Sequence, residues 1–292
     1  MDNQAQTAIR VSGVSIAANS VLSAAKLAAG LLAHSGAMVS DAIHSASDVF
    51  SSIIVMIGVR LSGKAPDREH PYGHERMECV VAILLAMILL ATGLFIGYGG
   101  VCKILYARDN DLSTPGVLAL IAAVVSIAVK EGMFWYTRHY ALQVNSGALM
   151  ADAWHHRSDA LSSVGAFAGI AGARMGLPVL DPLASIVICA FVSKAAFDIF
   201  RDAIDKMIDH SCDADTEAAI RRRVLDNPMV RRLDLLRTRE FGNRMYIELE
   251  IALDGAMSLN EAHHVAEQVH DDVEQSFPLV KHIMIHVNPD TR

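Results

Sequence analysis

Six long apolar stretches fill most of the first 200 residues, and this pattern constrains the fold more than any other feature of the sequence. Each stretch is roughly 20 residues or longer, which is the length an α-helix needs to cross the hydrocarbon core of a bilayer. The third is the clearest, since residues 80–95 contain no charge. The predicted spans are 11–33, 37–61, 79–102, 115–136, 145–172 and 178–199. We therefore predict an all-α transmembrane domain of six helices over residues 1–207.

Basic residues in the short connections between these spans indicate how the chain is oriented. Cytoplasmic loops of membrane proteins carry an excess of lysine and arginine. If both termini are cytoplasmic, the inner segments hold Arg10, Arg60, Lys64, Arg68, Arg76, Arg138, Arg201 and Lys206, whereas the outer loops hold only Lys103, Arg108 and Arg174. We therefore predict cytoplasmic N- and C-termini. No cleavable signal peptide is evident, because the first ten residues are polar and the next apolar stretch is long enough to remain as a membrane helix.

The composition changes after Phe200, where charged residues become frequent. Ser258, followed three residues later by Glu261, has the capping-box pattern that opens a helix, which we extend to about Phe277. The predicted elements are a helix over 215–225, strands over 230–240 and 245–253 joined by a turn at Gly242-Asn243, this capped helix, and a strand over 281–286. The order α-β-β-α-β predicts a small ferredoxin-like α+β domain over residues 208–292.

Two of the predicted spans carry a histidine and an aspartate four residues apart: His44 with Asp48, and His155 with Asp159. Residues at this spacing leave one face of a helix, so each pair presents an imidazole beside a carboxylate. If the two faces meet, two nitrogen and two oxygen ligands suit a divalent metal of borderline softness such as Zn²⁺, and the two carboxylates cancel its charge. The alternative is that these polar groups only pack helices together, but it must explain the same pair twice.

Other polar residues on the spans have more ordinary interpretations. Lys130 and Glu131 are interpreted as marking the inner membrane interface, where long cationic side chains reach toward water. His156 and Arg157 point away from the His155–Asp159 face, and we expect them to support the site or to lie at an interface. Asp152 is placed to extend a polar path toward the site.

A loop after the second span offers another set of ligands. Asp67, His70 and His74 are spaced three and four residues apart. Pro71 and Gly73 argue against a continuous helix, so a turn has to bring the three side chains together. A polar loop with incidental histidines at the membrane edge is the alternative interpretation.

Several function classes are disfavoured by composition and motif. The net charge of -7 gives no indication of nucleic-acid binding. An intramembrane metallohydrolase would be expected to carry a His-Glu-x-x-His helix, and His74-Glu75 is followed by no histidine at that spacing. The cysteines are scattered without a C-x-x-C pair, and we interpret Cys79, Cys102, Cys189 and Cys212 as free thiols.

These features together resemble the cation diffusion facilitator family, over nearly the whole chain. The resemblance rests on His44-x-x-x-Asp48, on Pro66-Asp67-x-x-His70-Pro71-Tyr72-Gly73-His74, on His155-x-x-x-Asp159 and on the terminal α+β domain. It implies a homodimeric transporter, not an enzyme, that exports divalent metals in exchange for protons. It further implies that Asp67, His70 and His74 form a second, cytoplasmic metal site.

The resemblance also implies ligands in the terminal domain, between two copies of the chain. The matching positions are Asp234, Glu250, His263, His286 and Asn288. Several bacterial relatives have histidine where this chain has Asp234 and Glu250, and aspartate in place of Asn288. This departure argues against a binuclear zinc cluster, and we expect either a single ion bound more weakly or a harder ion such as Mn²⁺ or Fe²⁺. A charged interlock between the loop and the terminal domain is carried over to Arg76 and Asp209.

We therefore expect a Zn²⁺/H⁺ antiporter in the inner membrane of a bacterium, with Zn²⁺ as substrate and as regulatory ligand of the terminal domain. Fe²⁺, Mn²⁺, Cd²⁺ and Co²⁺ are alternative substrates, although two histidines favour Zn²⁺ over the harder Mn²⁺. A metal-sensing or scaffold protein that no longer transports is the alternative from another class. The membrane lipid, metal ions, protons and a second copy are the only partners expected.

Overall fold

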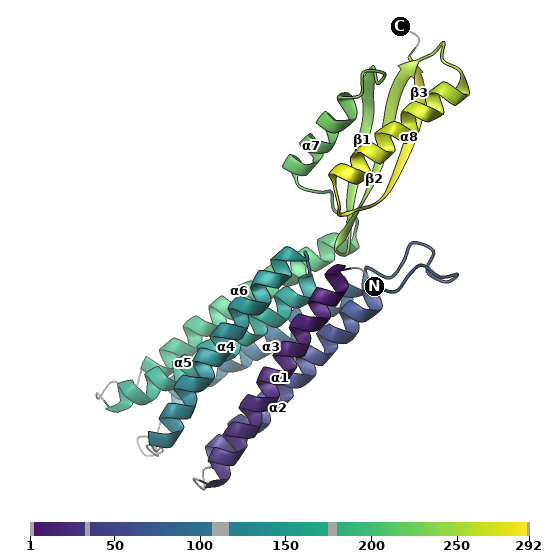
Figure 1. Ribbon diagram of the computed structural model, residues 1–292. Helices are drawn as coiled ribbons and strands as arrows, with labels where there is room; N and C mark the ends of the chain where they lie inside the picture. Colours follow the sequence, from purple (N-terminus) through teal and green to yellow (C-terminus); the bar gives the residue numbers. More distant parts are fainter. Residues whose placement is uncertain (1–2, 33–35, 107–116, 175–179, 291–292) are drawn as a thin grey trace. The chain divides into compact units, whose positions relative to one another are not determined.

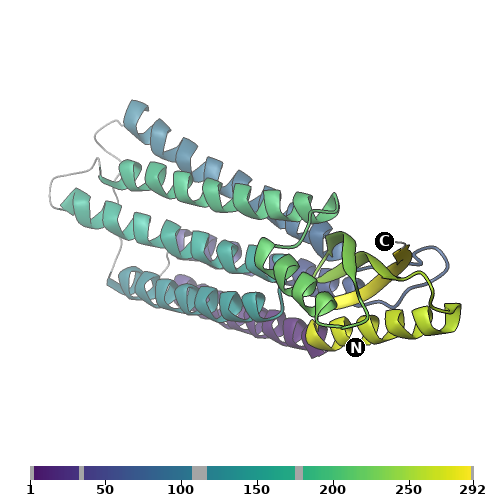
Figure 2. The same ribbon diagram turned by 90° about the horizontal axis from the view of Figure 1, so that it is seen from above.

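The computed structural model describes residues 3–32, 36–106, 117–174 and 180–290. Six long helices come first and run side by side (Figures 1 and 2). They are α1 (Asn3–Leu32), α2 (Gly36–Ser62), α3 (Met77–Tyr106), α4 (Val117–Gln143), α5 (Gly147–Arg174) and α6 (Leu180–Met207). At 27 to 30 residues, each is long enough to cross a bilayer. The predicted order of six membrane-length helices is confirmed.

The chain divides into two compact units, residues 1–203 and 204–292. Among the described helices of the first unit, the segments Gln6–Ala28 and Met77–Cys102 are apolar enough to cross a membrane by composition alone. The other helices are of similar length, and α2, α4 and α5 carry buried polar residues such as Asp48, Lys130 and Asp152.

Small residues allow close helix packing in the first unit. Helix α1 lies along α2, and α4 lies along α5. Val55, Leu89 and Leu149 are among the residues of the shared apolar core. A Cβ atom added at Gly58 of α2 would come within 2.3 Å of Val81 Cγ2 of α3, so a glycine is required for this approach. Packing of this kind holds several helices around one buried interior.

The second unit is a two-layer α+β domain. Its elements are α7 (Ala214–Leu225), β1 (Arg232–Phe241), β2 (Arg244–Asp254), α8 (Leu259–Ser276) and β3 (Val280–Asp290). The strand order is β1-β2-β3, with β1 antiparallel and β3 parallel to β2. Gly242 adopts a φ of 66° in the β1–β2 turn, a left-handed conformation that glycine adopts without steric cost. The predicted αββαβ fold class is confirmed.

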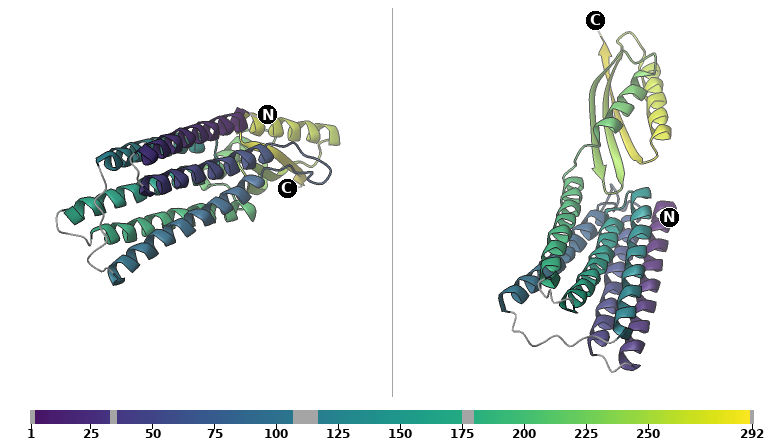
Figure 3. Two further views of the ribbon diagram at one scale, coloured as in Figure 1. Left: turned by 90° about the horizontal axis from the view of Figure 1, so that it is seen from below. Right: turned by 90° about the vertical axis from the view of Figure 1, so that its left-hand side faces the viewer.

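Both helices of the second unit cover one face of the sheet (Figure 3). Alternate residues of β2, including Ile247, Leu249 and Ile251, point into the core, as the two-residue period of a strand requires. Ile220 of α7 and Val269 of α8 pack against them. The predicted capping box opens α8, with its N-cap serine and third-position glutamate bonded reciprocally.

The observed elements are longer than the predicted ones at several ends. Helix α4 continues to Gln143, past the predicted end at 136, and α6 continues to Met207, past 199. Strand β3 runs to Asp290, past 286. Polar residues follow the apolar stretch at each of these ends, so the apolar stretch ends before the helix or strand does.

Candidate metal-binding sites

One group of metal-ligating side chains lies inside the first unit, between α2 and α5. Asp48 comes from α2, and His155 and Asp159 come from successive turns of α5. Their ligand atoms lie within 4.8 Å of one another, and all three residues are buried. His155 Nε2 is 3.5 Å from Asp48 Oδ1 and 4.0 Å from Asp159 Oδ2. His44, the predicted fourth ligand, is in α2, but its side chain lies outside the described part of the structure.

Lys130 of α4 joins this group, and its interpretation as an interface residue was wrong. Only 2% of the residue is exposed to solvent. Its Nζ lies 2.5 Å from Asp48 Oδ2 and 3.0 Å from Asp159 Oδ2, so the ammonium links two carboxylates on different helices. The neighbouring Glu131 does lie at the surface of the unit, paired with Arg157 at 3.0 Å. A buried lysine requires such partners, because a charge taken out of water without compensation is costly.

A second buried polar cluster lies one helical turn from the first along α5. His156 Nε2 is 3.5 Å from Asp152 Oδ2, and both side chains are fully buried. Ser52 of α2 donates a hydrogen bond to Asp152 Oδ1 at 3.2 Å, and Ser15 of α1 is 3.4 Å from His156 Nε2. Three helices therefore contribute to a continuous run of polar groups beside the metal-ligand group.

In the loop, Asp67, His70 and His74 form a second group whose ligand atoms lie within 4.8 Å of one another. Asp67 organises the turn, because its Oδ1 accepts hydrogen bonds from the backbone N–H groups of Glu69 and His70. His74 Nε2 is 3.6 Å from Asp67 Oδ2. Gly73 adopts a φ of 101° between them, which a residue with a Cβ rarely adopts. The turn brings the three side chains together without a helix.

Lys64 also binds the loop carboxylate, at 2.6 Å from Asp67 Oδ2. Its hydrogen bond, together with that from the His70 backbone, holds the pKa of Asp67 well below its usual value. Asp67 is therefore ionised at neutral pH and available as an oxygen ligand.

In the terminal unit, three of the predicted positions lie side by side on the three strands. The Asn288 side-chain amide donates to Asp234 Oδ2 at 3.1 Å and to Glu250 Oε2 at 3.3 Å. His286 is the register partner of Glu250 on β3. His263 lies on α8, with Nε2 3.4 Å from Glu267 Oε1. Among the described residues of this unit, no three ligands fall within 4.8 Å, and a site shared between two copies stays a prediction.

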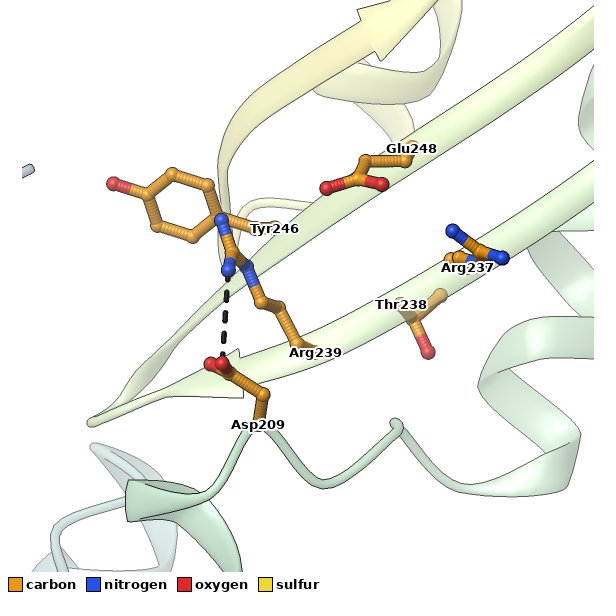
Figure 4. A pocket seen from close by; sticks show the side chains of 6 residues that line it. All are labelled: Asp209, Arg237, Thr238, Arg239, Tyr246 and Glu248. Carbon is orange, nitrogen blue, oxygen red and sulfur yellow. Dashed lines mark ion pairs between the residues drawn. The ribbon is translucent and has the colours of Figure 1, made fainter.

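Asp209 lines a pocket of the terminal unit, with a volume of about 170 Å³ (Figure 4). Its carboxylate pairs with the Arg239 guanidinium at 3.7 Å, and that guanidinium lies over the Tyr246 ring. Arg76 belongs to the other unit, so the interlock between Arg76 and Asp209 stays a prediction. Cys212, nearby in sequence, is a free thiol as predicted, and burial raises its pKa.

Comparison with known proteins gives matches along almost the whole chain. The model of the cation efflux transmembrane domain matches residues 12–208, and that of the cation efflux protein cytoplasmic domain matches residues 212–290. Metal tolerance protein C1 of Arabidopsis thaliana is 34% identical over 92% of this chain, which spans 59% of that relative. The uncharacterized transporter YdbO of Bacillus subtilis (strain 168) is 33% identical, with 92% of this chain and 91% of the relative covered.

Two further matches concern manganese and cadmium. The manganese efflux system protein MneP of Bacillus subtilis (strain 168) is 28% identical, and 97% of each chain is covered. Among solved structures, the cadmium form of a MamM CTD variant matches 26% of this chain and 96% of its own, with 21% identity and a TM-score of 0.26.

Proposed function

This chain belongs to the cation efflux family of divalent-metal transporters, and from that membership we propose that it exports Zn²⁺ from the cytoplasm in exchange for protons. It is a multi-pass membrane transporter and not an enzyme. The observation that carries the proposal is the convergence of Asp48, His155 and Asp159 inside the transmembrane unit. These three side chains, with His44 as a fourth ligand, are the proposed transport site.

The ligand set supports Zn²⁺ as the substrate. One described imidazole and two carboxylates, completed by the imidazole of His44, give the four nitrogen and oxygen ligands that Zn²⁺ takes in tetrahedral sites. Mn²⁺ prefers an all-oxygen environment. It is nevertheless the second candidate, because the relative MneP is named as a manganese efflux system protein.

The proposed exchange follows from the chemistry of the ligands. A metal binds only deprotonated imidazole and carboxylate, so protons and metal compete for the same atoms. A protein that alternates between inward-open and outward-open states therefore releases metal where protons are abundant and returns with protons bound. The buried cluster of Asp152 and His156 lies beside the site and is the proposed polar path to it.

The terminal unit is proposed to dimerise the chain in the cytoplasm. Its match to the cytoplasmic domain of cation efflux proteins supports this location, and the excess of basic residues in the inner segments supports cytoplasmic termini. In the proposed homodimer, metal bound near Asp234, Glu250, His263 and His286 would tighten the contact between copies. The membrane is proposed to be a bacterial inner membrane.

The proposal is tested with the purified chain in proteoliposomes that contain a zinc-sensitive dye and face an imposed proton gradient. The expected result is Zn²⁺ uptake that stops when an ionophore dissipates the gradient. Competition with excess Mn²⁺ ranks the two substrates in the same vesicles. If Mn²⁺ enters and Zn²⁺ does not, Zn²⁺ is not the substrate, although the protein is still a transporter. If Zn²⁺ uptake does not depend on the gradient, the proposed exchange for protons is wrong.

A further inference from the structure

We propose that Lys130 is a tethered cation that competes with the metal for the transport site and thereby sets its affinity. This inference rests on the proposed function. Lys130 is buried beside the proposed transport site but is not one of its four proposed ligands. The ammonium contacts Asp48 and Asp159, which are carboxylates on two different helices, and the side chain is 3% exposed.

The lysine and a bound metal require the same atoms. Nζ lies 2.5 Å from Asp48 Oδ2 and 3.0 Å from Asp159 Oδ2. A zinc ion bound by these oxygens would sit at about 2.0–2.2 Å from them, in the space that the ammonium fills. Two cations cannot share that space, because both steric overlap and charge repulsion oppose it. Binding of metal therefore requires that the ammonium withdraw, and the four-carbon stem of lysine is flexible enough to change its rotamer.

His155 has a different role from that of Lys130. Its Nε2 faces Asp48 Oδ1, whereas the ammonium contacts Oδ2 of the same carboxylate. The imidazole can thus remain in place as a ligand while the lysine leaves. Lys130 is consequently an affinity-determining residue and not itself a ligand.

A tethered cation also has a use in the transport cycle. Two carboxylates that face each other in a low-dielectric interior are costly without a compensating charge. Lys130 supplies one positive charge whenever the metal is absent, so the metal-free protein can change conformation with less uncompensated charge. The same residue should therefore weaken metal binding and speed turnover.

The test is equilibrium Zn²⁺ binding to the full-length chain in detergent, by competition with a fluorescent chelator. The transport-site signal is the component that Asp159→Ala removes. We expect Lys130→Met to tighten its dissociation constant at least about tenfold, the scale of a lost charge-assisted hydrogen bond. Lys130→Arg should weaken binding several-fold, because a bidentate guanidinium holds carboxylates better than an ammonium does. Lys194→Met, the same substitution on an exposed face of α6, should change nothing.

Turnover provides the second readout. Lys130→Met should transport more slowly in proteoliposomes although it binds more tightly. A residue that only held α2, α4 and α5 together would give weaker binding in Lys130→Met and near-normal binding in Lys130→Arg, and that pair of results would overturn the inference. If one of the two Lys130 variants does not fold, the other still tests the predicted direction of the change in the Zn²⁺ dissociation constant. Absence of any component sensitive to Asp159→Ala in the parent would instead overturn the proposed function.

Discussion

The ligand group between α2 and α5 and the ligand group of the loop use the same kinds of side chain, yet the first is buried and the second is partly exposed. Each combines carboxylate and imidazole, and in each a lysine contacts a carboxylate oxygen. Lys130 is buried and bridges two helices, whereas Lys64 is 56% exposed and contacts an aspartate three residues away. An exposed pair of this kind contributes little to stability, while a buried charge costs several kcal/mol without a partner. Burial, more than ligand identity, distinguishes the proposed transport site from the ligand group of the loop.

The largest expected difference between the two environments is in stability. Asp152→Ala would leave the buried His156 and Ser52 without the carboxylate that they contact. We expect the free energy of unfolding of the full chain to fall by roughly 3 to 5 kcal/mol, the usual cost of breaking a buried pair. The exposed counterpart, Lys64→Ala, should lower the free energy of unfolding far less, because solvent screens the pair. Reversible unfolding in mixed micelles measures both, and equal losses would contradict the comparison.

The pH dependence of the loop site is the next prediction. The depressed pKa of Asp67 means that its stabilising contacts are present above the ordinary aspartate pKa of about 4 and are lost only as pH falls through the lowered value. Between about pH 7.5 and about pH 5.5, Asp67 therefore stays ionised and keeps its contacts with Lys64 and with the backbone N–H groups of the turn.

We accordingly expect the Asp67 carboxylate to contribute nothing to any change in the Zn²⁺ affinity of the loop over that range. The measurement is isothermal titration of a chain that carries Asp159→Ala, so that the loop is observed without the transport site. A pH dependence that disappears in Asp67→Asn would mean that Asp67 titrates within this range, and it would contradict the prediction.

The smallest expected effect is that of Lys64→Met on loop affinity. Because this lysine is solvated, its removal should change the dissociation constant for Zn²⁺ less than about threefold. Lys130→Met is the same substitution at the buried lysine, and we expect it to change the dissociation constant of the transport site by a larger factor. If Lys64→Met shifted the loop affinity as much as Lys130→Met shifts that of the transport site, burial would not explain the difference between the lysines.

Periodicity and spacing predicted much of the fold and of the ligand groups. Long apolar stretches gave six helices, and the i, i+4 spacing placed His155 and Asp159 on one face of α5. The capping box at Ser258 located the start of α8. These predictions succeed because each depends on the spacing of neighbouring residues along the chain, which can be read from the sequence.

Lys130 was missed because its role depends on a helix end and on partners distant in sequence. The predicted fourth span ended at 136, which placed Lys130 near the interface, whereas α4 continues to Gln143 and carries the lysine deeper. Its partners, Asp48 and Asp159, lie on other helices. The available signal was a lysine that directly follows an apolar run ending at Val129, and spacing along the chain cannot reveal a contact between helices.

The most direct test of the account compares two isosteric substitutions, Asp48→Asn and Asp67→Asn, in Zn²⁺ uptake by proteoliposomes under the same proton gradient. Each removes one carboxylate charge, one from the buried group and one from the exposed group. We predict that Asp48→Asn reduces uptake to that of protein-free vesicles, while Asp67→Asn retains at least about a third of the parent rate, as expected for a solvated site outside the transport path. Undiminished uptake by folded Asp48→Asn would contradict the claim that metal crosses the membrane through Asp48, His155 and Asp159.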